Sequence, residues 1–290
     1  MADITAIILT KNEELNIEKC ILSIKSLVKR ILVIDSYSTD RTVELAEKLG
    51  AEVHAHVFEN HAKQFVYGLN TFKIETQWVL KLDADEELTE EAVKEIEEIC
   101  SSNKNTDING IELRFEIIFM GKSLRHGGAY PFTKLCVFKY GIGSMEERNL
   151  NEHIVLKEGR YVKVKSDSIH RDYKDLTHWI NKHNDYATKE VMDFYSGENQ
   201  FEQLNNMDKK TRRRRIIKYK IFYKLPAGIR NRLYFIYRYY FRLGFLDGKE
   251  GRIFTYLQAY WYHYLIDAKL YEKQKSDVQN RKINYGERKK

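Results

Sequence analysis

Two aspartates, Asp83 and Asp85, are separated by one residue and directly follow the apolar run WVLKL. Residues i and i+2 of an extended chain point to the same side, so the two carboxylates could act together. At the carboxyl end of a buried strand they would face the crevice in which open α/β sheets bind ligands. Sites made of oxygen atoms suit Mg²⁺ or Mn²⁺, which often bridge to phosphate oxygens. The same residues could instead form an acidic turn that caps the next helix.

Polar residues also follow two earlier apolar runs. Asp35 ends the run ILVID, and Thr10, Asn12 and Glu13 end or follow the run ITAIILT. A carboxylate at Asp35 can accept a base N–H or a ribose hydroxyl, and the helix N-terminus expected after Thr10 suits an anionic nucleotide. Capping of the next helix by Ser38 and Asp40 would also explain the residues after Asp35. The chain has no Gly-x-Gly-x-x-Gly and no P-loop motif after its first apolar run, which disfavours those two kinds of nucleotide site.

In order and spacing, these three segments resemble the family 2 glycosyltransferases, which have the GT-A fold. The matching segments are IILTKNE at 7–13, VIDSYSTD at 33–40 and LDADE at 82–86. The resemblance is greatest to members that build lipopolysaccharide core and capsule sugars. Those members also carry a glutamine at the place of Gln64 and a stretch like Gly121–Gly127, whereas their Arg-Leu-Phe-Arg type segment is altered here to CVFK at 136–139.

The resemblance implies roles for particular residues. The nucleotide-sugar donor would contact Thr10, Asn12, Glu13, Asp35, Gln64 and Asp83. Asp85 would bind Mn²⁺ or Mg²⁺, and His170 is the best positional match for a second metal ligand, although it could be an ordinary polar residue at a strand end. Inversion at the anomeric carbon would need one general base, for which Glu152 in NLNEH is the best match. A surface ion pair between Glu152 and Arg148 is the alternative.

The elements that would position these residues follow from apolar periodicity. Buried strands are expected at 4–10, 31–35, 52–57 and 78–82, alternating with helices at 12–27, 41–49, 61–72 and 90–100. Further strands are expected at 110–118, 133–139 and 161–169. This alternation predicts an α/β fold with a Rossmann-like, mostly parallel sheet flanked by helices. We expect a catalytic domain over 1–175, with the nucleotide-sugar part near 1–105 and the acceptor part near 106–175, and a helical, basic region over 176–290.

Charge is divided unevenly along the 290 residues, whose formal net charge is +7. Residues 205–290 carry 23 Lys/Arg and 7 Asp/Glu, which gives +16 and leaves −9 for the rest. An amphipathic helix is expected over Arg230–Gly244, with its apolar face formed by Leu233, Ile236, Tyr237, Tyr240 and Leu243 and its arginines off that face. Basic residues beside aromatic ones suit an anionic membrane surface, although the same helix could pack its apolar face on the catalytic domain.

Other functions fit the sequence less well. A sugar nucleotidyltransferase would need a glycine-rich loop where TKNEE stands, and no recognised nucleic-acid motif accompanies the basic residues. Three separated cysteines fit neither a zinc site nor a disulfide framework. With the first strand expected at Ile4 and no apolar run of spanning length, we expect a cytoplasmic protein, peripheral on the inner face of the membrane. The sugar, the base, the acceptor and the oligomeric state are left open.

Overall fold

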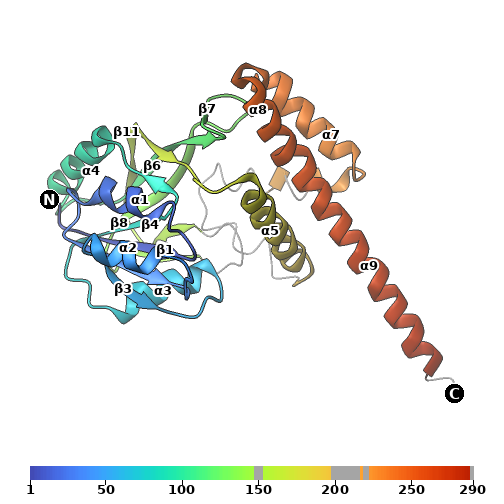
Figure 1. The fold of residues 1–290 in the computed structure, drawn as a ribbon, viewed down its shortest axis with the longest axis horizontal. Coiled ribbons are helices and arrows are strands. Elements are labelled where there is room, and N and C mark those ends of the chain that lie inside the picture. Colours follow the sequence, from blue (N-terminus) through green and yellow to red (C-terminus); the bar gives the residue numbers. More distant parts are fainter. Residues whose placement is uncertain (147–152, 197–215, 218–221, 288–290) are drawn as a thin grey trace. The chain divides into compact units, whose positions relative to one another are not determined.

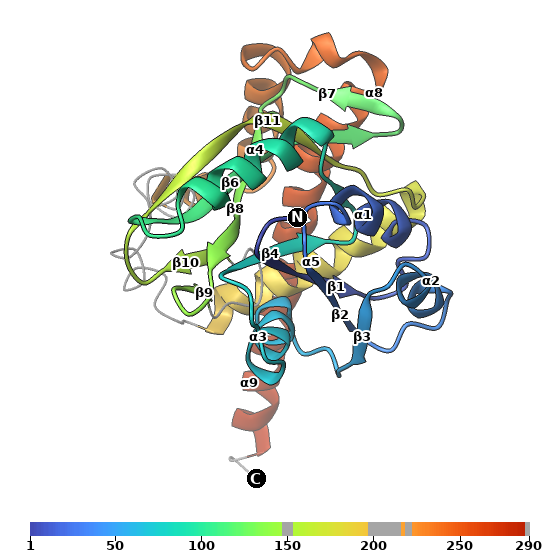
Figure 2. The same ribbon diagram turned by 90° about the vertical axis from the view of Figure 1, so that its left-hand side faces the viewer.

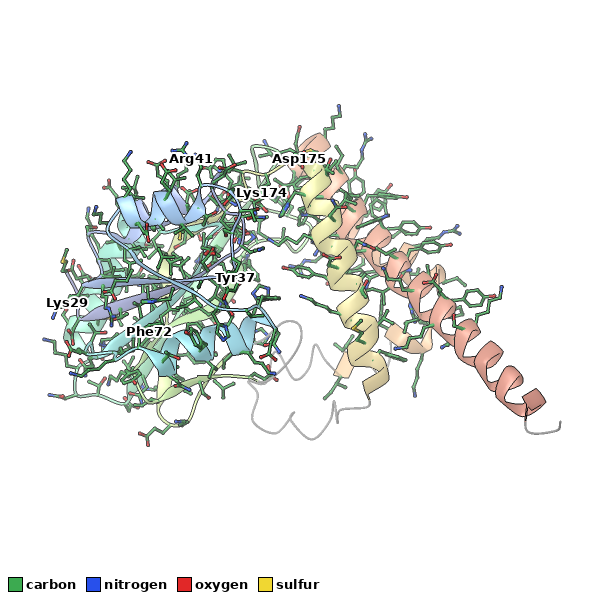
Figure 3. The ribbon with its side chains drawn as sticks, turned by 60° about the horizontal axis from the view of Figure 1, so that its bottom comes forward. Lys29, Tyr37, Arg41, Phe72, Lys174 and Asp175 are labelled. Carbon is green, nitrogen blue, oxygen red and sulfur yellow. The ribbon has the colours of Figure 1, made fainter. Side chains whose placement is uncertain are left out.

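The computed structural model describes residues 1–146, 153–196, 216–217 and 222–287. The chain divides into two compact units, Met1–Lys174 and Asp175–Lys290. The two residues at the division, Lys174 and Asp175, are labelled in Figure 3. We refer to these parts as unit 1 and unit 2.

Unit 1 is a mixed α/β structure built on one large sheet (Figure 1). Its strands are β1 (Ile4–Thr10), β2 (Arg30–Asp35), β3 (Glu52–Ala55), β4 (Trp78–Asp83), β5 (Glu86–Glu87), β6 (Ile108–Phe119), β7 (Lys122–Leu124), β8 (Phe132–Lys139) and β11 (Arg160–His170). Their order is β3-β2-β1-β4-β8-β6-β11-β5, with β7 paired to β6. The helices are α1 (Ile17–Ile24), α2 (Thr42–Lys48), α3 (His61–Thr71) and α4 (Glu90–Ser102). A separate hairpin joins β9 (Gly143–Met145) to β10 (Ile154–Leu156).

The first four strands of the sheet, β3-β2-β1-β4, are all parallel, as expected for the nucleotide-sugar part. Apolar side chains of β1 are buried on both faces, which explains its continuous apolar run. Ile4, Ala6 and Ile8 belong to the core shared with α1 and α4, whereas Ile7 belongs to the core shared with α3. Figure 2 shows these helices over the sheet.

The second part of the sheet is mixed in direction. Strand β8 runs antiparallel to both β4 and β6, while β11 runs parallel to β6. Between Lys163 and Asp167 the register of β11 against β6 shifts by two residues, because Lys163 faces Glu112 and Asp167 faces Arg114. The mostly parallel arrangement therefore describes the first part of the sheet and not the second.

The helix expected from residue 12 begins at Ile17 instead. Asn12 has a φ of 54°, in the left-handed region, so it cannot continue a helix. Backbone N–H groups of this loop bond to side chains after β2, including Asn12 N to Ser38 Oγ at 2.8 Å and Glu13 N to Thr42 Oγ1 at 2.7 Å. These bonds hold the loop in a shape that apolar periodicity does not reveal.

Unit 2 is helical in its described part. It contains α5 (Leu176–Ser196), α7 (Ile229–Ile236), α8 (Gly248–Thr255), α9 (Tyr262–Glu287), the π-helical segments η3 (Tyr237–Phe241) and η5 (Tyr256–Trp261), and the 3₁₀ turns η2 (Phe222–Lys224) and η4 (Gly244–Asp247). Helices α5 and α9 share a small core of Ala187, Val191, Ile266 and Leu270. No helix in the described residues is long and apolar enough to cross a membrane.

The helix expected over Arg230–Gly244 is present as α7 and η3, but it ends before Leu243, whose φ is 57°. Its arginines lie off the apolar face, as expected, but two of them are buried. Arg230 and Arg238 are only 6% and 8% exposed. Arg230 pairs with Asp267 on α9, a partner that periodicity along one helix does not reveal.

Candidate functional site

The carboxyl ends of β1, β2 and β4 meet at one edge of the sheet. Thr10 is in register with Asp35, and Leu9 is in register with Asp83. Parallel pairing thus brings together the three polar strand ends that the sequence separates by up to 73 positions. This edge is where open α/β sheets bind their ligands.

Asp35 is buried, at 2% exposure, and its carboxylate organises the loop after β2. It accepts hydrogen bonds from Thr10 Oγ1 at 2.8 Å and from Ser38 N at 2.7 Å, and it also bonds the Ser38 hydroxyl. A carboxylate has about four acceptor positions, so these three bonds leave one for a nucleotide. Asp35 therefore has a structural role, and the expected nucleotide contact would add to it.

Gln64 lies on α3 and is 1% exposed. Its Nε2 donates to Ser36 Oγ at 3.0 Å, and its Oε1 is 2.7 Å from His56 Nδ1. The His56 ring stacks on Tyr67, with the ring centroids 3.7 Å apart. Gln64 thus joins the segments that follow β2 and β3, which fixes the shape of this edge beside the expected nucleotide.

Asn12 and Glu13 lie in the loop after β1. Asn12 Oδ1 accepts the Thr39 N–H at 2.8 Å, and this bond joins the loops after β1 and β2. Glu13 Oε1 forms an ion pair with Lys174 at 2.7 Å, and Glu13 Oε2 accepts from Asn16 Nδ2 at 2.7 Å. Burial raises the pKa of Glu13 more than Lys174 lowers it, and nearby Asp85 raises it further.

Asp83 is held between two lysines. Its Oδ1 is 2.7 Å from Lys81 Nζ and its Oδ2 is 2.6 Å from Lys134 Nζ. Burial by itself would raise the pKa of Asp83, but Lys134 and Lys81 outweigh burial and hold that pKa well below its ordinary value. The Asp83 side chain is 38% exposed, so an ionised carboxylate at the sheet edge remains within reach of a ligand.

Lys134 and Glu86 also belong to this site; Lys134 was not expected there, and Glu86 was expected only as part of the segment LDADE. Lys134 comes from β8 and bridges Asp83 and Glu86, with its Nζ 2.6 Å from Glu86 Oε1. Glu86 is fully buried, and its Oε2 accepts the backbone N–H of Asp83 at 3.0 Å. Burial disfavours the charge on Lys134, yet Asp83 and Glu86 outweigh burial and raise the pKa of Lys134 well above its ordinary value. The one available signal was the position of Lys134 two residues before the altered segment at 136–139.

Asp85 and His170 are brought together by strand pairing. Strand β5 pairs antiparallel with β11 so that Glu86 faces His170, which places His170 Nε2 3.8 Å from Asp85 Oδ2. The reasoning that an extended chain carries Asp83 and Asp85 to the same side was wrong, because Ala84 and Asp85 form a turn. Asp83 contacts the lysines, while Asp85 lies beside His170.

Asp85 and His170 are the residues here that could together hold a divalent cation. Neighbouring ligand atoms in an octahedral shell of about 2.1 Å radius are about 3.0 Å apart, so the 3.8 Å pair would have to close by less than about 1 Å. Among the described residues no group of three or more His, Cys, Asp or Glu forms a metal site. Two protein ligands plus phosphate oxygens are, however, a common environment for Mg²⁺. Burial lowers the pKa of His170, but Asp85 and Glu86 outweigh it and raise that pKa above its ordinary value.

Within unit 1, hydrogen bonds join the segment after β11 to the loop after β1. Asn16, which is 2% exposed, donates to Asp172 Oδ1 at 3.0 Å and accepts the Tyr173 N–H at 2.9 Å. The Arg171 N–H donates to the backbone oxygen of Asp85 at 2.8 Å. These bonds fix the position of His170 relative to Asp85.

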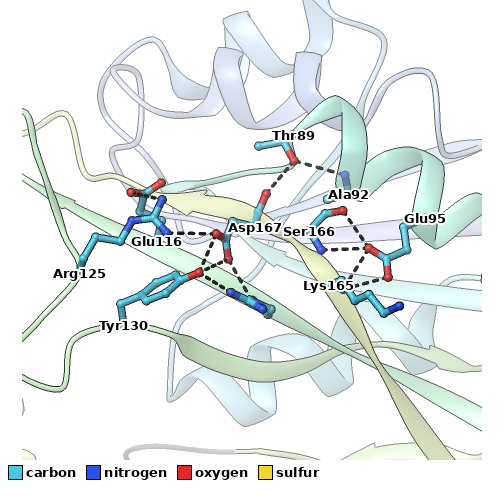
Figure 4. A network of polar contacts seen from close by, with 10 residues as sticks. Thr89, Ala92, Glu95, Glu116, Arg125, Tyr130, Lys165, Ser166 and Asp167 are labelled. Carbon is cyan, nitrogen blue, oxygen red and sulfur yellow. Dashed lines mark hydrogen bonds and ion pairs between the residues drawn. The ribbon is translucent and has the colours of Figure 1, made fainter.

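A second network of polar contacts surrounds the middle of β11 (Figure 4). Asp167 on β11 accepts from Arg114 Nε at 3.0 Å and from the Tyr130 hydroxyl at 2.8 Å, and it pairs with Arg125 at 3.4 Å. Glu95 on α4 accepts the backbone N–H groups of residues 165 and 166, where the register of β11 shifts. The network ties the segment 120–131 to β11 and holds the irregular part of the strand that ends in His170.

Glu152, the expected general base, lies outside the described residues, as does Arg148. Its role is therefore still a prediction from the sequence. Of the other expected site residues, Thr10, Asn12, Glu13, Asp35, Gln64 and Asp83 lie in or directly behind the loops at the edge of the sheet. The expected metal pair, Asp85 and His170, lies at the same edge.

Comparison with known proteins finds a family domain in the part of the chain that contains this edge of the sheet. Residues 5–111, which include the ends of β1, β2 and β4, match the model of Glycosyl transferase family 2. An uncharacterized glycosyltransferase of Rickettsia bellii is 42% identical over 99 residues, which are 34% of this chain and 33% of the relative. Another, from Rickettsia typhi, is 27% identical over 203 residues, covering 67% of this chain and 68% of the relative. The chain thus spans about a third of the first relative and two thirds of the second.

Among solved structures, glucosyl-3-phosphoglycerate synthase from Mycobacterium tuberculosis, in complex with Mn²⁺, uridine diphosphate and glucosyl-3-phosphoglycerate, is similar over part of its length. It has a TM-score of 0.33 and 23% identity, covering 39% of this chain and 44% of that protein. The α/β sheet of unit 1 has the expected GT-A type. Residues 5–111 thus form a Glycosyl transferase family 2 domain, which contains the carboxyl ends of the parallel strands β1, β2 and β4.

Proposed function

We propose that the chain is an inverting, metal-dependent glycosyltransferase that takes a hexose from a UDP-sugar. The acceptor is a saccharide or a lipid-linked saccharide in the synthesis of lipopolysaccharide or another cell-surface polysaccharide. The observation that carries the proposal is the meeting of Asp85 and His170 at the edge where β1, β2 and β4 end, inside the family-matched domain.

The residues at this edge suit a nucleotide diphosphate. Thr10, Asn12 and Asp35 order the loops on which the nucleoside would rest, and Asp83 offers an ionised carboxylate to a sugar or ribose hydroxyl. Asp85 and His170 would hold a divalent ion, which would supply positive charge to the diphosphate leaving group. Lys134 and Lys81 keep Asp83 charged at neutral pH, so the site is ready to bind before the donor arrives.

In the proposed reaction an acceptor oxygen attacks the anomeric carbon as the bond from that carbon to the diphosphate breaks. The acceptor hydroxyl gives its proton to Glu152, and the bonding electrons leave with the diphosphate. Attack from the face opposite the leaving group inverts the anomeric centre. Because Asp83 is paired with two lysines and Glu86 is fully buried, neither is suited to take that proton.

We also place the reaction at the cytoplasmic face of the membrane, where nucleotide sugars are made available. All three cysteines are buried free thiols, which suits a reducing compartment. Burial raises the pKa of Cys100 to about 12, so this thiol stays protonated and unreactive.

Calorimetric titration with UDP, in Mn²⁺ and in EDTA, tests the proposal. GDP run in parallel tests the choice of base. In the parent chain we expect Mn²⁺ to tighten UDP binding at least about tenfold. Changes around a metal site typically alter metal affinity by a factor of this size. Asp85→Asn should lose that difference, whereas Asp107→Asn, at a remote carboxylate paired with Arg160, should keep it. Equal UDP affinity in Mn²⁺ and in EDTA for the parent chain would overturn the metal-dependent function.

A further inference from the structure

Unit 2 exposes ten large apolar side chains in the segment that runs from the end of η2 through η4. We call this group the α7–η4 surface, and its members are Leu225, Ile229, Leu233, Ile236, Tyr237, Tyr240, Phe241, Leu243, Phe245 and Leu246. Each is between 39% and 75% exposed, with Phe241 the most exposed. The members on α7 and η3 recur at the three- and four-residue spacing of one helix face. Isolated exposed apolar residues are ordinary, but a group of this size marks an interaction site.

The inward side of the same helix is polar, which fixes its orientation. Arg230 forms a buried ion pair with Asp267 on α9, and Asn231 Nδ2 donates to Asp267 Oδ2 at 2.8 Å. Arg238 lies over the rings of Tyr234 and Phe254, with its guanidinium carbon 5.8 Å and 6.0 Å from their centroids. Rotating the helix to hide its apolar face would expose these buried groups and break the ion pair. The apolar face is therefore held outward by the packing of unit 2.

The charge around this surface has one sign. Lys224, Arg232, Arg242 and Lys249 are all exposed. The only acid between Lys224 and Lys249 is Asp247, which is 5% exposed. The whole stretch 205–290 carries +16. A partner that covers the α7–η4 surface must therefore offer apolar groups together with negative charge.

We infer that the α7–η4 surface docks on a lipid bilayer that carries anionic headgroups. Tyrosine and phenylalanine favour the boundary between headgroups and acyl chains, and nearby Lys and Arg are attracted to anionic lipid. A second copy of this chain fits less well. A two-fold interface would set this face against itself, so the exposed cations would meet like charges, and between Lys224 and Lys249 no exposed acid offsets them. Attachment at the interface also agrees with the absence of a spanning helix in the described residues.

Docking is independent of the proposed reaction, so it can be tested with no donor present. The full chain is sedimented with vesicles of phosphatidylcholine, with and without about one third phosphatidylglycerol. The test variant is Phe241→Ser/Leu246→Ser. Its matched control is Leu22→Ser/Val57→Ser, which removes two side chains of unit 1 that are 52% and 62% exposed. Thermal melting confirms that both variants fold, and gel filtration at several concentrations reports self-association.

We expect binding to anionic vesicles that weakens with added salt and is much poorer on phosphatidylcholine alone. The test variant should lose at least about tenfold in partitioning, because less apolar surface enters the interface. The control variant should bind like the parent. Binding unchanged in the folded test variant would overturn the inference by assigning attachment to charge alone. A parent dimer that the test variant dissociates, without vesicle binding, would overturn it in favour of a second copy.

Discussion

The two units place charge and apolar surface in opposite ways. In unit 1 charged side chains gather at the edge of the sheet, where Asp83 and the fully buried Glu86 both lie within ion-pair distance of Lys134. In unit 2 the buried charge is the Arg230–Asp267 pair between helices, and the large apolar side chains of α7 and η3 face outward. In unit 1 the charged groups lie at the candidate site, where they could bind a ligand. In unit 2 the buried ion pair orients the helix so that its apolar face is exposed and could bind a membrane.

Donor binding and membrane attachment are therefore expected to depend on different units. A substitution in one unit can test one property without disturbing the other. A change at the sheet edge of unit 1 should alter donor binding or turnover and leave attachment intact. A change on the α7–η4 surface should do the reverse. The three predictions below run from the largest expected effect to the smallest.

Glu152→Gln should lower turnover by roughly 10²–10⁴-fold, because an amide cannot accept the acceptor's proton. UDP affinity and vesicle binding should stay at the parent values, and the acidic limb of the pH–rate profile should disappear.

Phe241→Ser/Leu246→Ser should show the opposite pattern, with weaker vesicle binding and normal turnover on a soluble saccharide acceptor. Rates and UDP affinity measured on the same preparations separate the cases, with Glu158→Gln as the nearby control. Normal turnover in Glu152→Gln would move the base to another acid.

Lys134→Met should destabilise unit 1 by roughly 2–4 kcal/mol, because it removes the lysine that pairs with the buried Glu86 and leaves only His170, 3.6 Å away, beside that carboxylate. The expected loss lies toward the low end for buried pairs, since Asp83 keeps Lys81. The loss should shrink at acid pH, where the carboxylates can take up protons in place of the missing cation. Urea unfolding at neutral and acid pH measures both effects.

The control for that variant is Lys63→Met, which breaks an exposed ion pair with Glu59. Exposed pairs contribute little to stability, so this variant should unfold like the parent. If Lys134→Met also unfolded like the parent, the buried ion pairs at the sheet edge would not distinguish unit 1 from the surface.

His183 in unit 2 should make stability depend on pH. Its ring stacks on Trp179 with the centroids 3.5 Å apart, and burial lowers its pKa to about 4. The folded-state pKa is below the unfolded value, so between these pH values the unfolded chain binds a proton that the folded chain does not. Stability should therefore fall as the pH falls from about 6.5 to about 4. His183→Phe should remove a dependence on the order of 1–3 kcal/mol. Equal slopes of unfolding free energy against pH in the parent and the variant would contradict this.

The sequence predicted most of the elements and the edge of the sheet at which the candidate site residues meet, because both depend on local pattern. The runs ITAIILT, ILVID and WVLKL predict buried parallel strands, and such strands bring Thr10, Asp35 and Asp83 to one edge. The sequence also predicted that His170 lies at the end of a strand, because the residues of β11 themselves show the strand pattern.

The features missed in the sequence depend on partners distant along the chain. Lys134 enters the site because β8 pairs with β4, and no local pattern reveals that pairing. Arg230 is buried because Asp267 on another helix neutralises it. The short strands β5 and β7 were missed because two or three residues carry too little periodicity.

The irregularity in β11 determines which side chain of that strand stands beside Asp85. Two extra residues between Lys163 and Asp167 stand outside the regular ladder, and Glu95 on α4 holds their N–H groups. If those residues joined the ladder, the strand would advance by two positions, and Ser168 would stand where His170 now faces Glu86. An advance by an even number keeps inward side chains inward, so burial alone would not resist it. By bonding these N–H groups, Glu95 on α4 favours the register in which an imidazole, and not a hydroxyl, stands beside Asp85.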